Sequence, residues 1–210
     1  MTEALVTALM AALGGRRRTV LAPPGKTAAA VLVPLLAVDG APSLLFTRRS
    51  NLLPHHQGQI AFPGGRHHPD ADADLAATAL REAQEEIGLD PADVRLLGPL
   101  DDIETVATRF VITPFVGVAP HPYDFRPSPD EVDLIFTVPL GRLEAPDALR
   151  RELWDFGGRK VPIDVYAVDG HVIWGATQRI TQNLLAVLGD LACCVACSPS
   201  SCSPRWWRSS

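Results

Sequence analysis

A short segment with three glutamates on one face of an expected helix restricts this chain most. Glu82, Glu85 and Glu86 lie at positions i, i+3 and i+4, which share a helix face at about 100° per residue. Their mutual repulsion destabilises a helix by a few tenths of a kcal/mol per pair, so the arrangement brings no structural benefit. Hard divalent cations, in contrast, prefer carboxylate oxygens. By itself this pattern more often marks a solvated acidic face, and the residues upstream of it favour the metal-binding helix instead.

The helix itself is expected over residues 74–87. Its apolar side chains recur at helical spacing, at Ala76, Ala79 or Leu80, Ala83 and Ile87. Either Asp72 or Asp74 can cap its start, and Gly88 follows its end. Upstream, a short strand leads into Phe62-Pro63-Gly64-Gly65. Glycines let the backbone approach a phosphate or a metal closely, so this turn favours the metal-binding interpretation of the glutamates.

The stretch around the glutamates resembles the Nudix box, whose family pattern is G-x5-E-x7-R-E-U-x-E-E-x-G-U, with U a bulky apolar residue. The sequence R-E-A-Q-E-E-I-G-L at 81–89 matches the second half, although Ala83 is small for U. The first half departs, since Gly65 lies two residues earlier than the pattern requires and Ala73 stands in place of the leading glutamate. Asp72 and Asp74 flank that position; either of them, or neither, takes the place of the glutamate.

A second motif immediately upstream narrows the resemblance. Residues 44–65 are similar to the pattern L-L-T-x-R-S-x3-R-x3-G-x3-F-P-G-G of the coenzyme A pyrophosphatase branch. The matching positions are Thr47, Arg49, Ser50, Gly58 and the F-P-G-G sequence that ends in Gly64 and Gly65. Pro54 stands where that pattern has arginine, which removes one candidate phosphate contact. The later stretch I-W-G-A-T at 173–177 is also similar to this branch.

The resemblance implies an α/β (α+β) Nudix fold, in which a mixed, curved sheet is sandwiched between helices. By that analogy Glu82, Glu85 and Glu86 bind Mg²⁺ or Mn²⁺, Arg81 supports them, and Gly64-Gly65 shapes the turn that receives the diphosphate. The implied enzyme is a Nudix hydrolase that acts on phosphorus-containing anhydrides. It would convert coenzyme A or acyl-CoA to 3′,5′-ADP and phosphopantetheine or its acyl form.

A phosphorylated substrate also requires a cation and a base. Arg49 can contact a phosphate through a bidentate guanidinium group, or it can be a surface arginine at a strand end. By family analogy, Glu131 in a Pro-rich loop is the nominee for a further catalytic carboxylate, and Glu104 is the reserve. The base that activates water is then either Glu85 or Glu131.

Histidines and cysteines raise the alternative of zinc. Two adjacent pairs, His55-His56 and His67-His68, lie near the motifs, but such pairs in loops are more often solvated and the carboxylates favour a harder ion. All four cysteines lie in the tail, at Cys193, Cys194, Cys197 and Cys202. Cys194-x-x-Cys197 resembles half of a zinc site, yet this Ser/Pro-rich stretch offers nothing to pack against.

Changes in composition divide the chain into residues 1–26, 27–190 and 191–210. The first region is expected to be a short amphipathic helix, with Leu5, Leu9 and Ala12 on one side, followed by a solvated linker with Arg16, Arg17 and Arg18. The second is the Nudix domain. Its expected elements are hairpins at 28–49 and 159–174, strands near 94–100, 110–118 and 132–138, and a last helix at 176–188. The third is expected to be disordered and dispensable.

The bulk composition excludes several partners. A net charge of −5 provides no global basic field for nucleic acid, and no apolar run reaches the roughly 18 residues of a spanning helix. We therefore expect a cytoplasmic protein with a small nucleoside diphosphate substrate; the oligomeric state is not readable. The rivals are a Nudix enzyme for an NDP-sugar, a dinucleotide or an oxidised nucleotide, and a non-catalytic Nudix-like sensor. Such sensors usually lose box carboxylates, whereas this chain keeps all three.

Overall fold

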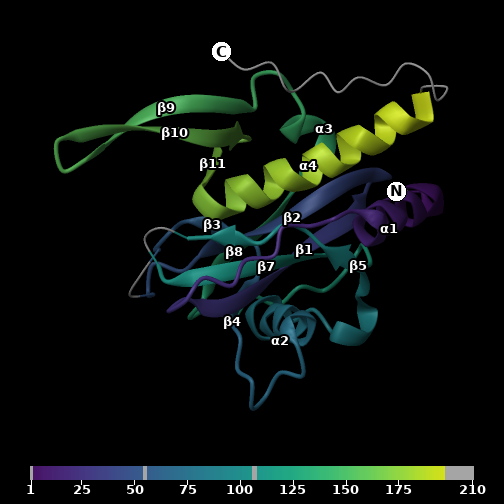
Figure 1. The fold of residues 1–210 in the computed structure, drawn as a ribbon, viewed down its shortest axis with the longest axis horizontal. Coiled ribbons are helices and arrows are strands. Elements are labelled where there is room, and N and C mark those ends of the chain that lie inside the picture. Colours follow the sequence, from purple (N-terminus) through teal and green to yellow (C-terminus); the bar gives the residue numbers. More distant parts are fainter. Residues whose placement is uncertain (1, 54–55, 106–107, 197–210) are drawn as a thin grey trace.

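A mixed sheet forms the centre of the computed structural model, which describes residues 2–53, 56–105 and 108–196 (Figure 1). Strand β1 (Thr27–Val38) runs antiparallel to β2 (Ala41–Arg49) and β4 (Gly64–Arg66), and parallel to β7 (Phe110–Val118). The expected hairpin between β1 and β2 is present. Its turn places Asp39 and Gly40 at φ of 48° and 81°, the left-handed region that Asp and Gly tolerate best.

The remaining strands extend this sheet on both sides. Strands β3 (Ile60–Ala61) and β8 (Val132–Pro139) pair with β2, while β5 (Arg95–Pro99) and β6 (Ile103–Glu104) pair with β7. A 3-10 turn, η1 (Pro91–Asp93), precedes β5, and a short helix, α3 (Leu140–Leu143), follows β8. The sheet is therefore mixed, as the family resemblance implied.

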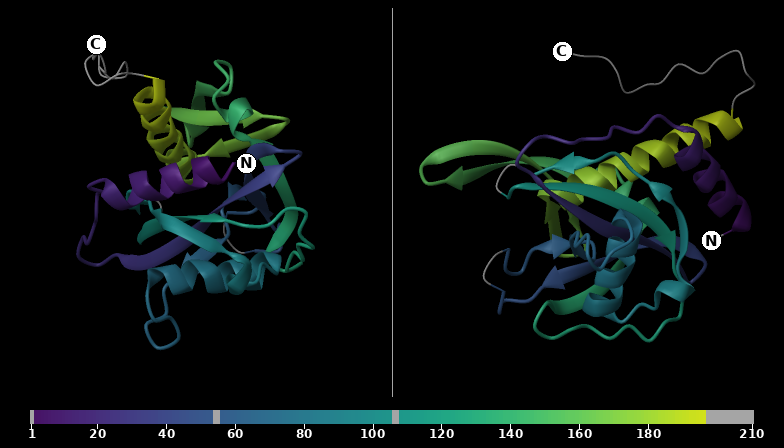
Figure 2. Two further views of the ribbon diagram at one scale, coloured as in Figure 1. Left: turned by 90° about the vertical axis from the view of Figure 1, so that its right-hand side faces the viewer. Right: turned by 60° about the horizontal axis from the view of Figure 1, so that its bottom comes forward.

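Two apolar layers cover the two faces of the sheet (Figure 2). Helix α2 (Leu75–Ile87) packs on one face, where Ala79, Ala83 and Ile87 are fully buried against Leu32 and Leu36. Helices α1 (Glu3–Gly15) and α4 (Gly175–Ala196) cover the other face, where they share a core with strand residues such as Phe46 and Val33. Ala83, which departs from the bulky residue of the family pattern, lies in the layer between α2 and the sheet.

The N-terminal segment belongs to this core. Val6, Leu9 and Leu13 are the buried residues of α1, so the buried stripe is displaced by one position from the expected set of Leu5, Leu9 and Ala12. Leu5 and Ala12 are only partly buried. The helix ends at Gly15, the second of two consecutive glycines.

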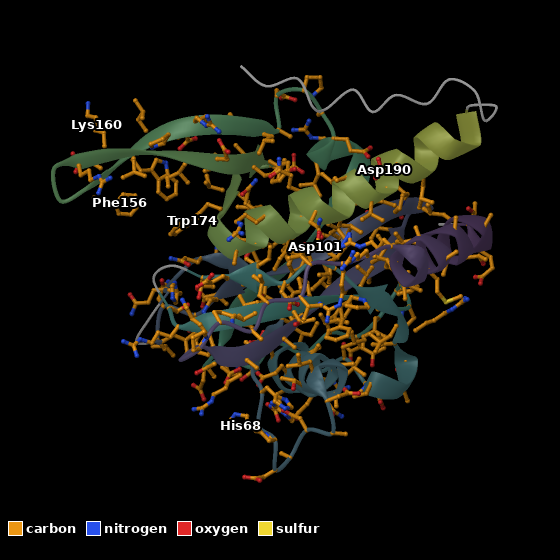
Figure 3. The ribbon with its side chains drawn as sticks, viewed as in Figure 1. His68, Asp101, Phe156, Lys160, Trp174 and Asp190 are labelled. Carbon is orange, nitrogen blue, oxygen red and sulfur yellow. The ribbon has the colours of Figure 1, made fainter. Side chains whose placement is uncertain are left out.

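The basic linker is not a freely solvated segment, so that part of the sequence interpretation was wrong. Arg16 donates to Asp101 over 2.5 Å, and Arg18 donates to Asp102 over 2.7 Å. Asp101 also accepts a 2.8 Å hydrogen bond from the Asn183 amide on α4 (Figure 3 labels Asp101). These two aspartates fasten the linker to the domain; they lie far along the chain from it, which is why local composition did not show the contact.

A second, three-stranded sheet projects beside α4 (Figure 1). Strand β10 (Arg159–Val168) lies between β9 (Leu149–Phe156) and β11 (His171–Trp174), all antiparallel. The hairpin with the Asp169-Gly170 turn was predicted, but β9 was not. Helix α4 extends to Ala196, past its expected end at residue 188, so the first part of the range 191–210 is helical. Residues 197–210 lie outside the described chain. Among the described helices, none combines the length and apolar character needed to cross a bilayer.

Candidate active site

Asp72, and not Asp74, supplies the carboxylate that pairs with Arg81. The Arg81 guanidinium donates from Nε to Asp72 Oδ1 over 2.8 Å and from Nη2 to Oδ2 over 3.1 Å. The Thr78 hydroxyl and the His68 backbone N–H donate to the same carboxylate, over 2.9 and 3.0 Å. These hydrogen bonds, above all those from Arg81, hold the pKa of Asp72 well below its usual range.

Asp74 has a different role, because it is the N-cap of α2. Its carboxylate accepts a 2.8 Å hydrogen bond from the Ala77 backbone N–H. The helix ends at Gly88, whose φ of 68° is the left-handed conformation of a C-cap. Of the supports for Asp72, the sequence interpretation missed Thr78 and the His68 backbone; a threonine one turn into the helix carries no signal that separates it from any other helix residue.

Arg81 also holds two of the three helix glutamates. Its Nη2 lies 2.9 Å from Glu82 Oε1, and its Nη1 lies 2.9 Å from Glu85 Oε2. Glu85 is half exposed, whereas only 14% of the Glu82 side chain is exposed. Burial raises the pKa of Glu82 above its usual value, although Arg81 opposes the shift. Arg81 therefore fixes the glutamate face of α2 while it anchors the preceding loop.

Glu86 is the most buried of the three glutamates, with 5% of the residue exposed. Burial raises the pKa of its carboxyl group to about 8, and the neighbouring Arg49 works in the opposite direction. Glu131 and Glu82 add to the increase by charge repulsion, while a hydrogen bond from the Gly64 backbone opposes it. A carboxylate in such a place is costly unless a cation lies nearby, which is the environment expected of a metal ligand.

The two glycines of the F-P-G-G turn are required by close approach. A Cβ atom on Gly65 would lie 2.5 Å from the Glu82 carboxylate, and one on Gly64 would lie 2.4 Å from the backbone oxygen of Ala30. Gly64 and Gly65 pair with Val31 and Ala30 on β1. The turn therefore brings the backbone against the glutamate face of α2.

Arg49 and Glu131 reach the same cluster from other elements. Arg49 lies at the end of β2, and its buried Nε has no hydrogen-bond partner among the described residues. Glu131 precedes β8, and its backbone carbonyl accepts a 2.8 Å hydrogen bond from the Ser50 N–H. The charge of Arg49 acts on Glu86, and that of Glu131 acts on both Glu82 and Glu86. The structure thus brings these two predicted residues to the glutamates.

The Pro-rich loop before β8 is attached to the end of α2. The Ser128 N–H donates to the backbone carbonyl of Glu86 over 2.9 Å, and the Arg126 N–H donates to that of Ile87, also over 2.9 Å. These contacts satisfy carbonyls that lack partners at a helix end. They also explain how a surface loop can hold Glu131 beside a buried glutamate.

Other candidates lie elsewhere. Glu104 forms an ion pair with Lys26 at 3.2 Å, and it is not among the charges that shift Glu82 or Glu86. His67 hydrogen-bonds Thr78 at 2.8 Å, and His68 lies in the loop before α2 (Figure 3). Within the described chain, no three His, Cys, Asp or Glu side chains are arranged to hold a metal ion as they stand. Pro54, His55, Cys197 and Cys202 lie outside the described residues, as do the side chains of Cys193 and Cys194.

The two consecutive arginines at the end of β2, Arg48 and Arg49, lie on opposite faces of the sheet. Leu45 faces α2, and Arg49, four residues on, lies beside Glu86. Leu44 and Phe46 face the other layer, and Arg48 on that side lines a groove of about 510 Å³ with Trp154, Trp174 and His171. The groove contains none of the clustered glutamates.

Comparison with known proteins identifies the family to which this chain belongs. The NUDIX domain model matches residues 26–156. The chain is 38% identical over 173 residues to a protein of Cronobacter sakazakii described as uncharacterized Nudix hydrolase NudL, covering 77% of this chain and 83% of the relative. A NudL protein of Escherichia coli strain SMS-3-5 is 37% identical over 172 residues, with 77% and 82% covered.

Solved structures agree on the fold. A NUDIX hydrolase from Alicyclobacillus acidocaldarius superposes with a TM-score of 0.52 at 21% identity, covering 79% of this chain and 93% of that one. A MutT/nudix family protein from Enterococcus faecalis gives a TM-score of 0.52 at 13% identity, covering 90% and 75%. The expected mixed sheet between helices is confirmed. This chain belongs to the Nudix family, and it is a hydrolase.

Proposed function

We propose that this protein is a Mg²⁺- or Mn²⁺-dependent pyrophosphatase and that its substrate is coenzyme A or an acyl-CoA. The observation that carries the proposal is the position of Arg49 beside Glu86. Arg49 belongs to the upstream motif that resembles the coenzyme A branch, while Glu86 belongs to the box. A cationic group whose buried Nε has no partner among the described residues suits a substrate that carries several phosphates.

The donor set fits hard divalent cations. Five carboxylates, those of Asp72, Glu82, Glu85, Glu86 and Glu131, share two guanidinium groups, those of Arg49 and Arg81. Because Asp72 already takes two hydrogen bonds from Arg81, the surplus negative charge lies on the glutamates, of which Glu82 lies against Gly65 and Glu86 accepts a hydrogen bond from Gly64. Glu82, Glu85 and Glu86 would hold the metal ion. When bound, the ion would supply positive charge that stabilises the transition state and would lower the pKa of the attacking water.

The residues of the chain would bind the substrate and activate the attacking water. Gly64 and Gly65 let the diphosphate approach the backbone, and Arg49 binds a phosphate oxygen. Glu85 or Glu131 would orient or deprotonate the attacking water, since both residues are exposed to solvent. Cleavage of coenzyme A would yield 3′,5′-ADP and phosphopantetheine.

Parallel turnover assays test this assignment. Coenzyme A, NADH and ADP-ribose should be offered with Mg²⁺ and with Mn²⁺, and the products separated by chromatography. The proposal predicts the highest kcat/KM for coenzyme A. A clear preference for NADH or ADP-ribose would keep the metal-dependent hydrolysis and remove coenzyme A as the substrate.

A further inference from the structure

Strand β9 is a free edge that carries an unusual share of exposed apolar side chains. In the described sheet it pairs with β10 alone, so the backbone groups of its other edge have no strand partner. The hairpin of β9 and β10 extends away from the main sheet, with Phe156 and Lys160 at its free end (Figure 3). Three of the seven large apolar residues that are exposed in the described chain lie on β9, namely Leu149, Leu153 and Phe156.

Such an edge can form backbone hydrogen bonds with a further strand. Leu153 is 68% exposed and Phe156 is 51% exposed, and water contact with both is unfavourable. Soluble proteins usually protect a long edge strand with a proline, a bulge or a covering element. Strand β9 has neither proline nor bulge in its pairing with β10. It does carry charges, and their order along the strand identifies the partner.

We propose that β9 pairs with β9 of a second copy of this chain, antiparallel and centred on Leu153, to give a twofold-symmetric dimer with one continuous sheet. A twofold axis perpendicular to the sheet keeps the same faces together, so residues that oppose each other must be an even number of positions apart. With Leu153 at the centre, Arg151 faces Asp155 of the second copy, Arg150 faces Phe156, and Glu152 faces Trp154. Each of these pairs occurs twice.

The neighbouring registers are less favourable. Centring on Arg151 or on Glu152 would place identical charges directly opposite each other, which is destabilising. Centring on Trp154 would set Glu152 against Phe156 and Asp155 against Leu153. The register centred on Leu153 sets this residue, the most exposed apolar residue of β9, against its own copy. It also places one pair of opposite charges, Arg151 with Asp155, on each side of Leu153.

The proposed ion pairs do not require existing contacts to break. Arg151 donates to Asp164 through Nε and Nη2, over 2.6 and 2.9 Å, which leaves its Nη1 hydrogens available. Asp155 accepts the Gly158 N–H through Oδ1 over 2.6 Å, which leaves Oδ2 available. Nη1 of Arg151 in one copy can therefore meet Oδ2 of Asp155 in the other.

Disulfide trapping tests the register directly. The full-length chain is prepared with the four tail cysteines replaced by serine, and Leu153→Cys is compared with Lys160→Cys on the same hairpin. Opposed residues of an antiparallel pair have Cα atoms about 4.5–5.5 Å apart, within the range that a disulfide spans. Residue 160, one strand further in, is out of reach of its own copy. Under mild oxidation Leu153→Cys should form the covalent dimer at least about tenfold faster, since pairing raises the effective concentration of the thiols.

Sedimentation of the unmodified protein provides a second measurement. The parent chain should show concentration-dependent dimerisation, and Leu153→Glu, which sets two carboxylates against each other, should stay monomeric with unchanged hydrolase activity. Equal crosslinking rates for the two cysteine variants, or a parent that stays monomeric at every concentration, would overturn the proposal. Neither result would bear on the assignment of the substrate.

Discussion

The guanidinium group of Arg81 holds Asp72 through two hydrogen bonds, of 2.8 and 3.1 Å. The same group reaches Glu82 and Glu85. An aspartate one position before the place of the family glutamate thus pairs with the arginine of the box in this chain.

Replacing Asp72 or Asp74 by asparagine should affect the stability of the protein differently. Asp72→Asn removes the charge that Arg81 pairs with, so the free energy of unfolding at neutral pH should fall by about 1–3 kcal/mol. Asp74→Asn should change it little, because asparagine caps a helix as well as aspartate does. Urea unfolding followed by tryptophan fluorescence measures both. Equal losses would contradict the separation of roles.

The pH dependence of this effect has a defined sign. The pKa of Asp72 is lowered in the folded state, so its contribution to stability is present above its ordinary pKa of 3.8 and disappears as the pH falls toward the folded-state value. The difference between the parent and Asp72→Asn should therefore shrink in acid.

The two glycines of the turn should also respond differently to alanine. In Gly64→Ala the new Cβ meets the backbone of Ala30 and Val31, which cannot move without disturbing β1, so the melting temperature should fall strongly. In Gly65→Ala the Cβ meets the end of the Glu82 side chain, which can rotate away. The protein should then stay folded while it loses most of its turnover. A fully active Gly65→Ala would show that the position of Glu82 is unimportant.

Glu86 should make the metal-free protein less stable at alkaline pH. Its pKa is raised from 4.5 to about 8 in the folded state, so the folded protein keeps a proton that the unfolded chain releases. This contribution is complete below about pH 4.5 and is lost as the pH rises through 8. It amounts to a few kcal/mol, because one unit of pKa shift is worth about 1.4 kcal/mol.

Thermal unfolding in EDTA between pH 5 and 9 measures this effect. Glu86→Gln should remove most of the slope, while Glu85→Gln, in which an exposed carboxylate is changed, should keep it. Excess Mg²⁺ should restore stability at high pH if the ion replaces the proton. A slope that is the same in Glu86→Gln would mean that another group is responsible.

Removal of the Arg49 side chain should lower kcat/KM for the substrate, whereas removal of the neighbouring Arg48 side chain should not. Arg49→Ala should reduce kcat/KM for coenzyme A by about 10- to 100-fold, the loss expected for hydrogen bonds to a charged group. If Arg49 binds the 3′-phosphate, dephospho-coenzyme A will be affected less; if it binds the diphosphate, both will be affected equally. Arg48→Ala, on the opposite face of the same strand, is the control. No change with either substrate would remove Arg49 from the site.

Much of the domain follows from local sequence signals. The hairpin at Asp39-Gly40, the capped helix α2 and the glutamate face all have periodic or turn signatures, and the structure contains each of them. Strand β9 was missed because six of its eight residues are exposed and neither face is buried, so L-R-R-E-L-W-D-F has no apolar period of two. The end of α4 was placed too early because a change in composition was taken for a change in structure.

The parts that sequence could not settle depend on contacts between distant segments. Asp72 and Asp74 are equally plausible caps until the path of the loop is known. The Arg16 and Arg18 partners lie more than eighty positions away, and the counter-charge for Glu86 comes from β2. Linear spacing does not report such pairings.

Turnover of coenzyme A by Glu86→Gln tests the central claim most directly. The substitution keeps the shape of the side chain and removes the charge of a proposed metal ligand. With saturating Mg²⁺, kcat should fall by a factor on the order of 10³ while the variant stays folded. Glu104→Gln, which alters a carboxylate outside the cluster, should keep nearly full activity. A Glu86→Gln enzyme with near-normal kcat at saturating Mg²⁺ would contradict the assignment of this helix as the metal-binding element.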